Sequence, residues 1–390
     1  MPAPDESEPG TSAPGTSDVV AVVASGPALA DAARRCWDEG RTILPFDPGF
    51  TAGELDELHA RLRPAEPAAA GTAAIVVTSG TAGAPKGVEL TRAGMEVMAR
   101  GYSAGLGMGP DDRWLACLPL HHVAGLGVLA RAYVTGVPCT VHEGFDVERV
   151  ARSPATEGTT VGSLVPTALR RLLDAGAPMH EFRRIITGGA PCPPALRARA
   201  EAAGARVVDA YGLTETWGGF ALDGRPIAGT EARIDEREGE ILVRGAVIMR
   251  GYRFDPDRTA ATVDAGGWLH TGDVGELDSD GRIRVVDRLK DLVITGGVNV
   301  SPTEIEAVLA HHRAVDDVCV AGVPDDEWGE RVVAFVVPRP GMPEPSLADL
   351  RAFARDRLSA PKLPREVRIV AAIPRTPGGK PLRRQLRESS

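Results

Sequence analysis

Short apolar runs alternate with helical patterns over the first half of the chain. The run Ala74–Val77 precedes a glycine-rich loop and a helical pattern over 91–100, and the run Trp114–Leu118 precedes a helical pattern over 126–133. Similar units recur to about residue 199. This alternation predicts an α/β fold that is built on largely parallel sheets.

The pattern changes after Tyr211. Strand-like segments with closely spaced turns, such as Gly239–Gly245 and Asp278–Val286, predict a small β-rich subdomain. A further start follows at Ser301, where Pro302 suits the first helical position and Glu304 completes an expected capping box. The remaining segments predict a smaller α+β C-terminal domain, with the boundary near Lys290.

Composition narrows the possible functions. The first 18 residues are rich in Pro, Ser, Thr, Gly and acids, which predicts a disordered tail rather than a signal peptide. The net charge of −9 and the absence of a basic stripe argue against nucleic acid. No apolar run approaches the ~20 residues of a membrane helix. Five scattered cysteines without a C-x-x-C pair indicate no zinc site or disulfide framework, so we expect a cytoplasmic protein.

Lysine is rare. Of the 44 basic residues only four are Lys, at positions 86, 290, 362 and 380. A position that keeps Lys where Arg is otherwise used is a candidate for needing a compact point charge.

The strongest motif lies directly after the first of these strands. The segment 78–87 reads TSGTAGAPKG, so glycines, hydroxyl groups and one Lys are concentrated in a loop that could bind phosphate. It lacks the order of a Walker A loop, and a plain surface loop is the alternative. The predicted phosphate ligands are Thr78, Ser79, Gly80, Thr81, Gly83 and Lys86.

From about residue 73 to 385 the chain resembles the acyl-adenylate-forming enzymes, or AMP-binding superfamily, with Ala82 as a mild departure in the loop. The resemblance implies ATP, Mg²⁺ and coenzyme A as ligands. It also implies an N-terminal AMP-binding domain at 19–289 and a mobile C-terminal domain at 291–390 that turns about a hinge at Lys290.

A second motif, DAYGLTET at 209–216, offers an aromatic ring, a hydroxyl group and a carboxylate within a few residues. The resemblance assigns adenine stacking to Tyr211, the α-phosphate to Thr214 and the metal ion to Glu215. Without the first motif, a core Tyr and a surface Glu would be the preferred interpretation. The adenine pocket would also include Gly189, Ala190, Asp209 and Gly212, the last of which would also border the acyl substrate.

The third motif is GWLHTGD at 267–273, followed by Arg288. A carboxylate on a tight turn suits a ribose diol, and the resemblance assigns the ribose to Asp273 and Arg288. Alone, Asp273 would be interpreted as a solvated turn residue.

The fourth motif, PRTPGGK, ends at Lys380. Its Pro and Gly residues predict a presented loop, and the resemblance makes Lys380 the catalytic lysine that stabilises the adenylation transition state. A solubilising charge near the C-terminus is the alternative.

The fifth motif, LPLHHVAG at 118–125, contains His121 and His122. Adjacent side chains diverge, which argues against a metal pair, and the resemblance implies a gate beside the acyl pocket. Gly125–Ala130 also fits G-x-G-x-x-A, a weak signature that leaves an NAD-linked oxidoreductase as an alternative from another class.

The substrate is indicated less directly. The segment SLVPT at 163–167, with Arg171 nearby, resembles the o-succinylbenzoate-CoA ligases of menaquinone synthesis. Arg171 is the candidate for the second carboxylate of that acid, and the backbone at Gly296 and Gly297 for the coenzyme A path. Another aryl or acyl acid remains the alternative within the class. The oligomeric state is open, and a homodimer is compatible with the sequence.

Overall fold

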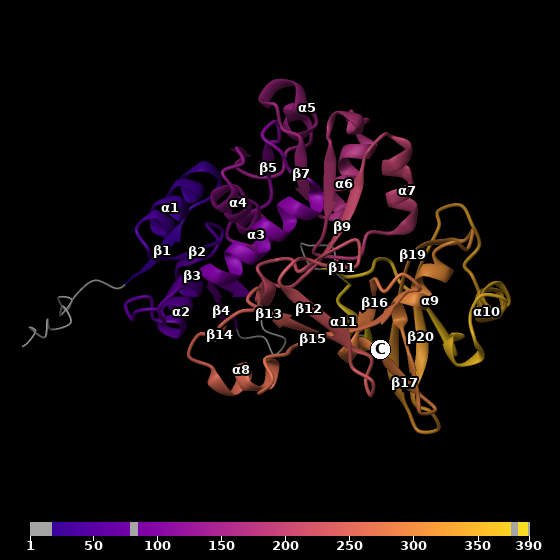
Figure 1. Ribbon diagram of the computed structural model, residues 1–390. Helices are drawn as coiled ribbons and strands as arrows, with labels where there is room; N and C mark the ends of the chain where they lie inside the picture. The colour runs from indigo at the N-terminus through magenta and orange to yellow at the C-terminus, as the bar shows by residue number, and fades with distance from the viewer. Residues whose placement is uncertain (1–17, 79–84, 376–380, 389–390) are drawn as a thin grey trace, which may run out of the picture.

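The computed structural model describes residues 18–78, 85–375 and 381–388, which form four sheets with covering helices (Figure 1). The first sheet has the order β1-β2-β3-β4-β14 and is mixed, since β1, β2 and β3 are parallel and β4 and β14 are antiparallel to their neighbours. Its strands are β1 (Val19–Val23), β2 (Thr42–Phe46), β3 (Thr72–Thr78), β4 (Lys86–Thr91) and β14 (Gly251–Tyr252).

The second sheet has the order β11-β10-β9-β8-β7-β5-β6 and is parallel from β9 to β6. Its strands are β5 (Trp114–Ala116), β6 (Cys139–Val141), β7 (Val161–Leu164), β8 (Arg184–Thr187), β9 (Val207–Tyr211), β10 (Ala221–Leu222) and β11 (Arg225–Pro226). The prediction of a parallel α/β sheet is therefore right for this block. It is wrong for β3 and β4, because the glycine-rich loop joins two antiparallel strands rather than a strand and a helix.

The helices of the large domain are α1 (Gly26–Asp38), α2 (Ala52–Leu62), α3 (Arg92–Leu106), α4 (Val123–Thr135), α5 (Val147–Glu157), α6 (Pro166–Asp174), η1 (Met179–Glu181), α7 (Pro194–Ala202), η2 (Thr214–Thr216) and α8 (Pro256–Thr262). In Figure 1, α3 runs between the first two sheets. Its buried Met98 and Tyr102 belong to one core with Val76 of the first sheet and Trp114 of the second. The burial of such side chains joins the two sheets into one body.

A third, antiparallel sheet forms the predicted β-rich subdomain and has the order β12-β13-β15-β16. Its strands are β12 (Thr230–Ile234), β13 (Glu240–Gly245), β15 (Leu269–Leu277) and β16 (Ile283–Arg288). A 3-10 turn, η3 (Leu289–Asp291), follows β16 and leads into the smaller C-terminal domain. Lys290, the predicted hinge residue, is exposed in this turn.

The C-terminal domain has its own core, which includes Val300, Ile305 and Val320. In Figure 1 it lies beside the third sheet. Its elements are β17 (Val293–Thr295), β18 (Val298–Val300), α9 (Pro302–Leu309), β19 (Val315–Asp325), β20 (Gly329–Pro338), α10 (Leu347–Ala354), η4 (Ala360–Lys362), β21 (Glu366–Ile369) and α11 (Arg383–Glu388).

The start of α9 differs in one respect from the prediction. Ser301 Oγ accepts a hydrogen bond from the Glu304 amide, as expected of an N-cap. The expected capping box is wrong, because the Glu304 carboxylate pairs with Lys362 instead. The Asp287 carboxylate of β16 accepts hydrogen bonds from Ser301 Oγ and the Thr303 amide, so it connects this helix to the large domain.

Candidate active site

A lysine and a glutamate 129 residues apart form the centre of the candidate site. Lys86 Nζ, at the start of β4, lies 2.9 Å from Glu215 Oε1 in η2 and 2.7 Å from Tyr252 Oη on β14. Tyr252 Oη donates to the same Glu215 oxygen at 2.7 Å. The side chains of Lys86 and Glu215 are only 16% and 13% exposed, so the three groups form one shielded polar cluster.

The protonation state of Glu215 follows from two opposing effects. Burial acts to raise the pKa of Glu215, but the charge of Lys86 and the hydrogen bonds from Tyr252 and Lys86 outweigh it, so the pKa lies below its ordinary value. Burial and the Glu215 charge raise the pKa of Tyr252, which therefore keeps its proton. The cluster presents a carboxylate and an ammonium group that could exchange their mutual contact for a metal ion and a phosphate.

Glu215 is suited to such a metal. Mg²⁺ in nucleotide sites is usually held by one or two carboxylates, with substrate phosphates and waters completing the shell. The described residues contain no group of three or more His, Cys, Asp or Glu that could hold a metal alone. A single carboxylate next to Lys86, at the end of the candidate phosphate-binding loop, fits a magnesium ion that arrives with its nucleotide.

The loop itself is described only at its ends. Thr78 and Lys86 are paired across β3 and β4, and Thr78 Oγ1 is buried with no hydrogen-bond partner among the described residues. Such a group is suited to a polar ligand. The predicted ligands Ser79, Gly80, Thr81 and Gly83 lie outside the described residues, and so does Lys380.

The turn η2 is held so that Thr214 and Glu215 follow β9 directly. Trp217 is fully buried, and its Nε1 donates to the Thr91 carbonyl at the start of α3. A Cβ atom on Gly212 would lie 2.3 Å from the Gly219 Cα, so only glycine permits this turn to fold back on itself.

The predicted ribose residues are brought together with the predicted adenine residue. Asp273 and Arg288 are directly paired across β15 and β16, and Arg288 Nε lies 2.8 Å from Asp273 Oδ1. Tyr211 Oη donates to the other Asp273 oxygen at 2.8 Å. Burial and the Asp273 charge raise the pKa of Tyr211, so the phenol is neutral and holds the carboxylate in place.

The carboxyl ends of β8 and β9 place the remaining adenine candidates side by side. Thr187 and Asp209 are register partners, and Thr187 Oγ1 donates to Asp209 Oδ1 at 2.7 Å. Gly189 and Ala190 follow β8 in a bend, where Gly189 has a φ of +78°. Loops at the carboxyl ends of parallel strands commonly bind nucleotides.

The histidine pair lies at the start of α4. The rings of His121 and His122 are 4.4 Å apart, and His121 Nε2 lies 3.3 Å from the Asp47 carboxylate. Burial lowers the pKa of both histidines, and the neighbouring His122 lowers that of His121 further. Both rings are therefore neutral near pH 7 and can take part in hydrogen bonds without adding charge.

The NAD-linked alternative is wrong. Gly125 and Gly127 lie inside α4, and a Cβ on Gly125 would lie 2.4 Å from the Pro119 carbonyl oxygen. These glycines serve packing, whereas a dinucleotide fingerprint needs them in the loop before a helix.

The arginine predicted to bind the acid and the two glycines predicted for the coenzyme A path lie on other elements. Arg171 is exposed on α6 with its guanidinium 5.1 Å from the Phe145 ring, and no ion pair in the described part of the chain includes it. Gly296 and Gly297 form the turn between β17 and β18, with φ values of +58° and +77°.

Sequence reasoning missed two residues. Tyr252 carries no sequence signal, because a two-residue strand places it beside Lys86. Asp47 follows β2 in a Pro-Gly turn, in a segment for which the sequence predicts neither a strand nor a ligand; the apolar run at 43–46 is the signal that could have identified the end of a strand there.

Comparisons with known proteins agree with this geometry. The profile described as AMP-binding enzyme matches residues 15–253. The chain belongs to the AMP-binding enzyme family. The profile described as AMP-binding enzyme C-terminal domain matches residues 304–380, so both parts of the family are represented.

Within the family, two curated relatives are 2-succinylbenzoate-CoA ligases. That of Bacillus pumilus is 37% identical over 337 residues, covering 81% of this chain and 68% of the relative. That of Geobacillus sp. (strain WCH70) is 35% identical over 339 residues, with the same coverage. These comparisons support the broader assignment of the chain as an ATP-dependent acyl-CoA ligase.

Solved structures of the family share the fold. The chain is similar to o-succinylbenzoate CoA synthetase (MenE) from Bacillus subtilis in complex with its acyl-adenylate intermediate, with a TM-score of 0.83, 28% identity and coverage of 95% of this chain and 88% of that one. It is also similar to ATP-bound MatB from Rhodopseudomonas palustris, with a TM-score of 0.84, 25% identity and coverage of 96% and 89%. In the part of this chain that the structure describes, no helix is long and apolar enough to cross a bilayer.

Proposed function

We propose that this chain adenylates o-succinylbenzoate with ATP and Mg²⁺ and then transfers the acyl group to coenzyme A. The observation that carries the proposal is the shielded cluster of Lys86, Glu215 and Tyr252 beside the glycine-rich loop. The names of the curated relatives support the choice of acid.

In the first half-reaction, a carboxylate oxygen of the acid bonds to the α-phosphorus as the bond to the bridging oxygen breaks and pyrophosphate leaves. Bound Mg²⁺ would neutralise phosphate charge. Lys86 turns from Glu215 to the phosphates, Glu215 would hold the metal ion, and Tyr252 keeps its hydrogen bond to the Glu215 carboxylate. Thr214 donates to the α-phosphate, and Lys380 stabilises the charge that develops there.

The nucleoside is bound by the groups around β9 and β15. Tyr211 offers its ring to adenine with Gly189, Ala190, Asp209 and Gly212 around it, while Asp273 accepts hydrogen bonds from the ribose hydroxyls. Arg288 and the Tyr211 hydroxyl fix the orientation of the Asp273 carboxylate before the nucleotide arrives.

In the second half-reaction, the thiol sulfur of coenzyme A bonds to the acyl carbon as the bond from that carbon to the phosphate oxygen breaks; AMP leaves and the thiol proton passes to solvent. The C-terminal domain turns about Lys290 between the two steps, withdraws Lys380 and brings the turn at Gly296 and Gly297 to the thiol path. His122 gates this path, and His121 borders the acyl group.

Arg171 is the candidate for the second carboxylate of the acid, because no side chain among the described residues neutralises its charge within ion-pair distance. The likeness to MatB favours a second candidate function, the activation of another acyl acid by the same machinery.

Pyrophosphate exchange across a panel of aryl and aliphatic acids tests the proposal. We expect o-succinylbenzoate to support the fastest exchange. We also expect Arg171→Gln to raise the KM for this acid about tenfold or more, as the loss of a charge-assisted pair implies, with the adjacent exposed Arg170→Gln as the matched control. Exchange with another acid alone would favour the second candidate, and exchange with none would contradict both.

A second experiment tests whether Lys380 acts only in the adenylation half-reaction. Lys380→Ala should lower adenylation by about 100-fold or more, yet leave thiol transfer from supplied acyl-adenylate unchanged. Equal losses in both steps would contradict a lysine that acts only in the first.

A further inference from the structure

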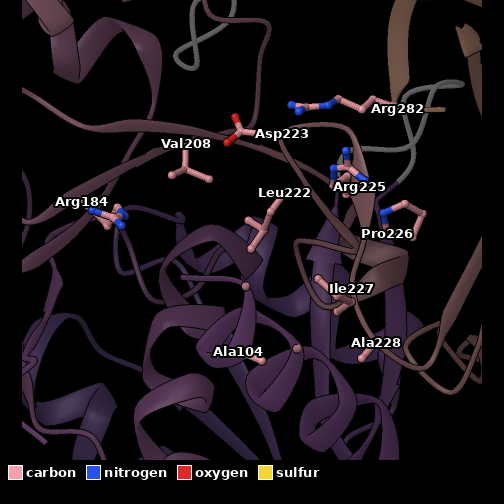
Figure 2. Close-up of a pocket in the computed structure, with 12 residues that line it drawn as sticks. Ala104, Arg184, Val208, Leu222, Asp223, Arg225, Pro226, Ile227, Ala228 and Arg282 are labelled. Atoms are coloured by element: carbon pink, nitrogen blue, oxygen red, sulfur yellow. The ribbon is translucent and has the colours of Figure 1, made fainter. Parts of the chain in front are cut away.

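A cavity of about 590 Å³ lies between α3 and the hairpin of β10 and β11 (Figure 2). It is lined by apolar side chains that include Val208, Leu222 and Ile227, by the carboxylate of Asp223, and by three arginines, which are Arg184 of β8, Arg225 of β11 and Arg282 directly before β16. Its volume is typical of sites for small organic ligands. None of these residues belongs to the proposed active site.

The cavity lies on the other face of β9 from Asp209. Successive side chains of a strand point to opposite faces. The carboxylate of Asp209 contacts Arg197 of α7, whereas the adjacent Val208 lines the cavity beside α3. A ligand here would therefore be separated from the adenine pocket by the sheet.

The apolar wall is built by close contact. A Cβ atom on Gly101 of α3 would lie 2.7 Å from the Ile227 Cβ, and one on Gly105 would lie 2.8 Å from Leu222 Cδ1. The two glycines allow the hairpin to approach the helix more closely than any other residue would. The position of the apolar wall is therefore determined by the packing of the hairpin against α3.

A tight turn positions two of the arginines. Asp223 and Gly224 have φ values of +45° and +74°, as in a two-residue hairpin turn. The Ile283 amide donates to the Gly224 carbonyl at 2.8 Å. This contact ties β16 to the hairpin and places Arg282 beside Arg225, on the side of the cavity opposite Arg184 (Figure 2).

The positive charge at the cavity is only partly compensated by carboxylates. Among the described residues, no ion pair includes Arg184 or Arg225, and Arg282 has Asp280 as its partner at 3.8 Å with a buried Nε that lacks a hydrogen bond. Asp223 also lines the cavity, but its carboxylate accepts hydrogen bonds from the Asp209 amide and Arg197, and the charge of Asp278 acts on Arg225 and Arg282 without forming an ion pair with them. Burial and the charges of Arg183 and Arg206 lower the pKa of Arg184.

We propose that this cavity is a second ligand site, for an organic anion that carries a carboxylate, phosphate or sulfonate group on an apolar ring. The ring would pack on Leu222 and Ile227, and the anionic group would pair with the neighbouring Arg225 and Arg282, while Arg184 adds positive charge on the opposite side (Figure 2). Apolar area and charge-assisted hydrogen bonds together provide affinity and orientation.

The probe 8-anilinonaphthalene-1-sulfonate tests the proposal, because it combines apolar rings with one sulfonate group. With the full-length protein at saturating ATP and Mg²⁺, its fluorescence should report one saturable site. The triple variant Arg184→Gln, Arg225→Gln and Arg282→Gln should weaken binding about tenfold or more. A control triple variant at the exposed Arg61, Arg237 and Arg355 should bind as the wild type does.

A second variant and a second probe distinguish the contribution of the apolar wall from that of the arginines. Ala104 borders the cavity from an exposed position of α3, so Ala104→Trp should fill the cavity and abolish binding without disturbing the core. The neutral N-phenyl-1-naphthylamine should bind the triple Gln variant and the wild type alike. The proposal is overturned if ATP displaces the sulfonate probe completely, or if neither the Gln substitutions nor Ala104→Trp weakens its binding.

Discussion

Two lysine–glutamate pairs in this protein have the same chemistry and different surroundings. Lys86 and Glu215 are 2.9 Å apart with side chains 16% and 13% exposed, between two sheets of the large domain. Lys362 and Glu304 are 2.6 Å apart with side chains 29% and 42% exposed, on the C-terminal domain. The first pair is shielded by Tyr252, whereas the second joins η4 to the start of α9 near the surface.

The difference lies in the cost of separating the charges. Water can solvate the members of an exposed pair, so such pairs contribute little to stability. A shielded pair that loses one member leaves the other without solvation, and this costs several kcal/mol. A shielded pair is therefore suited to ligands that supply a replacement charge to each member, as we propose for a phosphate and a metal ion at Lys86 and Glu215.

The largest effect is expected for Lys86→Met. The substitution leaves the Glu215 carboxylate shielded and unpaired, so we expect the free energy of unfolding to fall by about 3 kcal/mol and pyrophosphate exchange to fall by about 100-fold or more. Urea denaturation and the exchange assay measure the two effects. A loss of activity without a loss of stability would show that the pair does not stabilise the free protein.

Tyr252→Phe should have a smaller effect. It removes the hydroxyl that links Lys86 to Glu215 but keeps the ring against Lys86, whose Nζ lies 4.0 Å from the ring centroid. We expect a loss of about 1 kcal/mol in the free energy of unfolding and a modest fall in exchange rate. Unchanged stability in thermal and urea denaturation would argue against the hydroxyl as a structural link.

The pH dependence of the free energy of unfolding tests the contribution of the Glu215 carboxylate separately from that of Lys86. Because the pKa of Glu215 is lower in the folded protein, its contribution is present above the unfolded value near 4.5 and is lost as pH falls through the folded value. Glu215→Gln should therefore flatten the decline of the unfolding free energy below pH 4.5. An identical decline in variant and wild type would contradict the lowered pKa.

The smallest effect is expected for Lys362→Met. Because this pair is half-exposed, the free energy of unfolding should change by less than about 1 kcal/mol, and pyrophosphate exchange should stay as in the wild type. A loss as large as that of Lys86→Met would remove the contrast between the two pairs.

Much of the fold could be predicted from patterns. The capped start of α9 at Ser301 and the strand β13 follow from local residue choice, and the structure confirms both. The antiparallel pairing of β3 with β4 was not predicted, because β4 is a short strand directly after the glycine-rich loop and its residues were not recognised as a strand. The capping box failed for a different reason, since Lys362 competes for Glu304 from 58 residues away.

By itself, the sequence determined the family, the candidate ligands in their motifs and the alternation of strands and helices in the second sheet, because these depend on residue type and on short spacing. Only the tertiary structure decided that Lys86, Glu215 and Tyr252 contact one another, and that Tyr211, Asp273 and Arg288 form one network. Charged side chains become shielded and paired where strands that are distant in the sequence pack together. The protonation state of each side chain therefore depends on neighbours that only the tertiary structure shows.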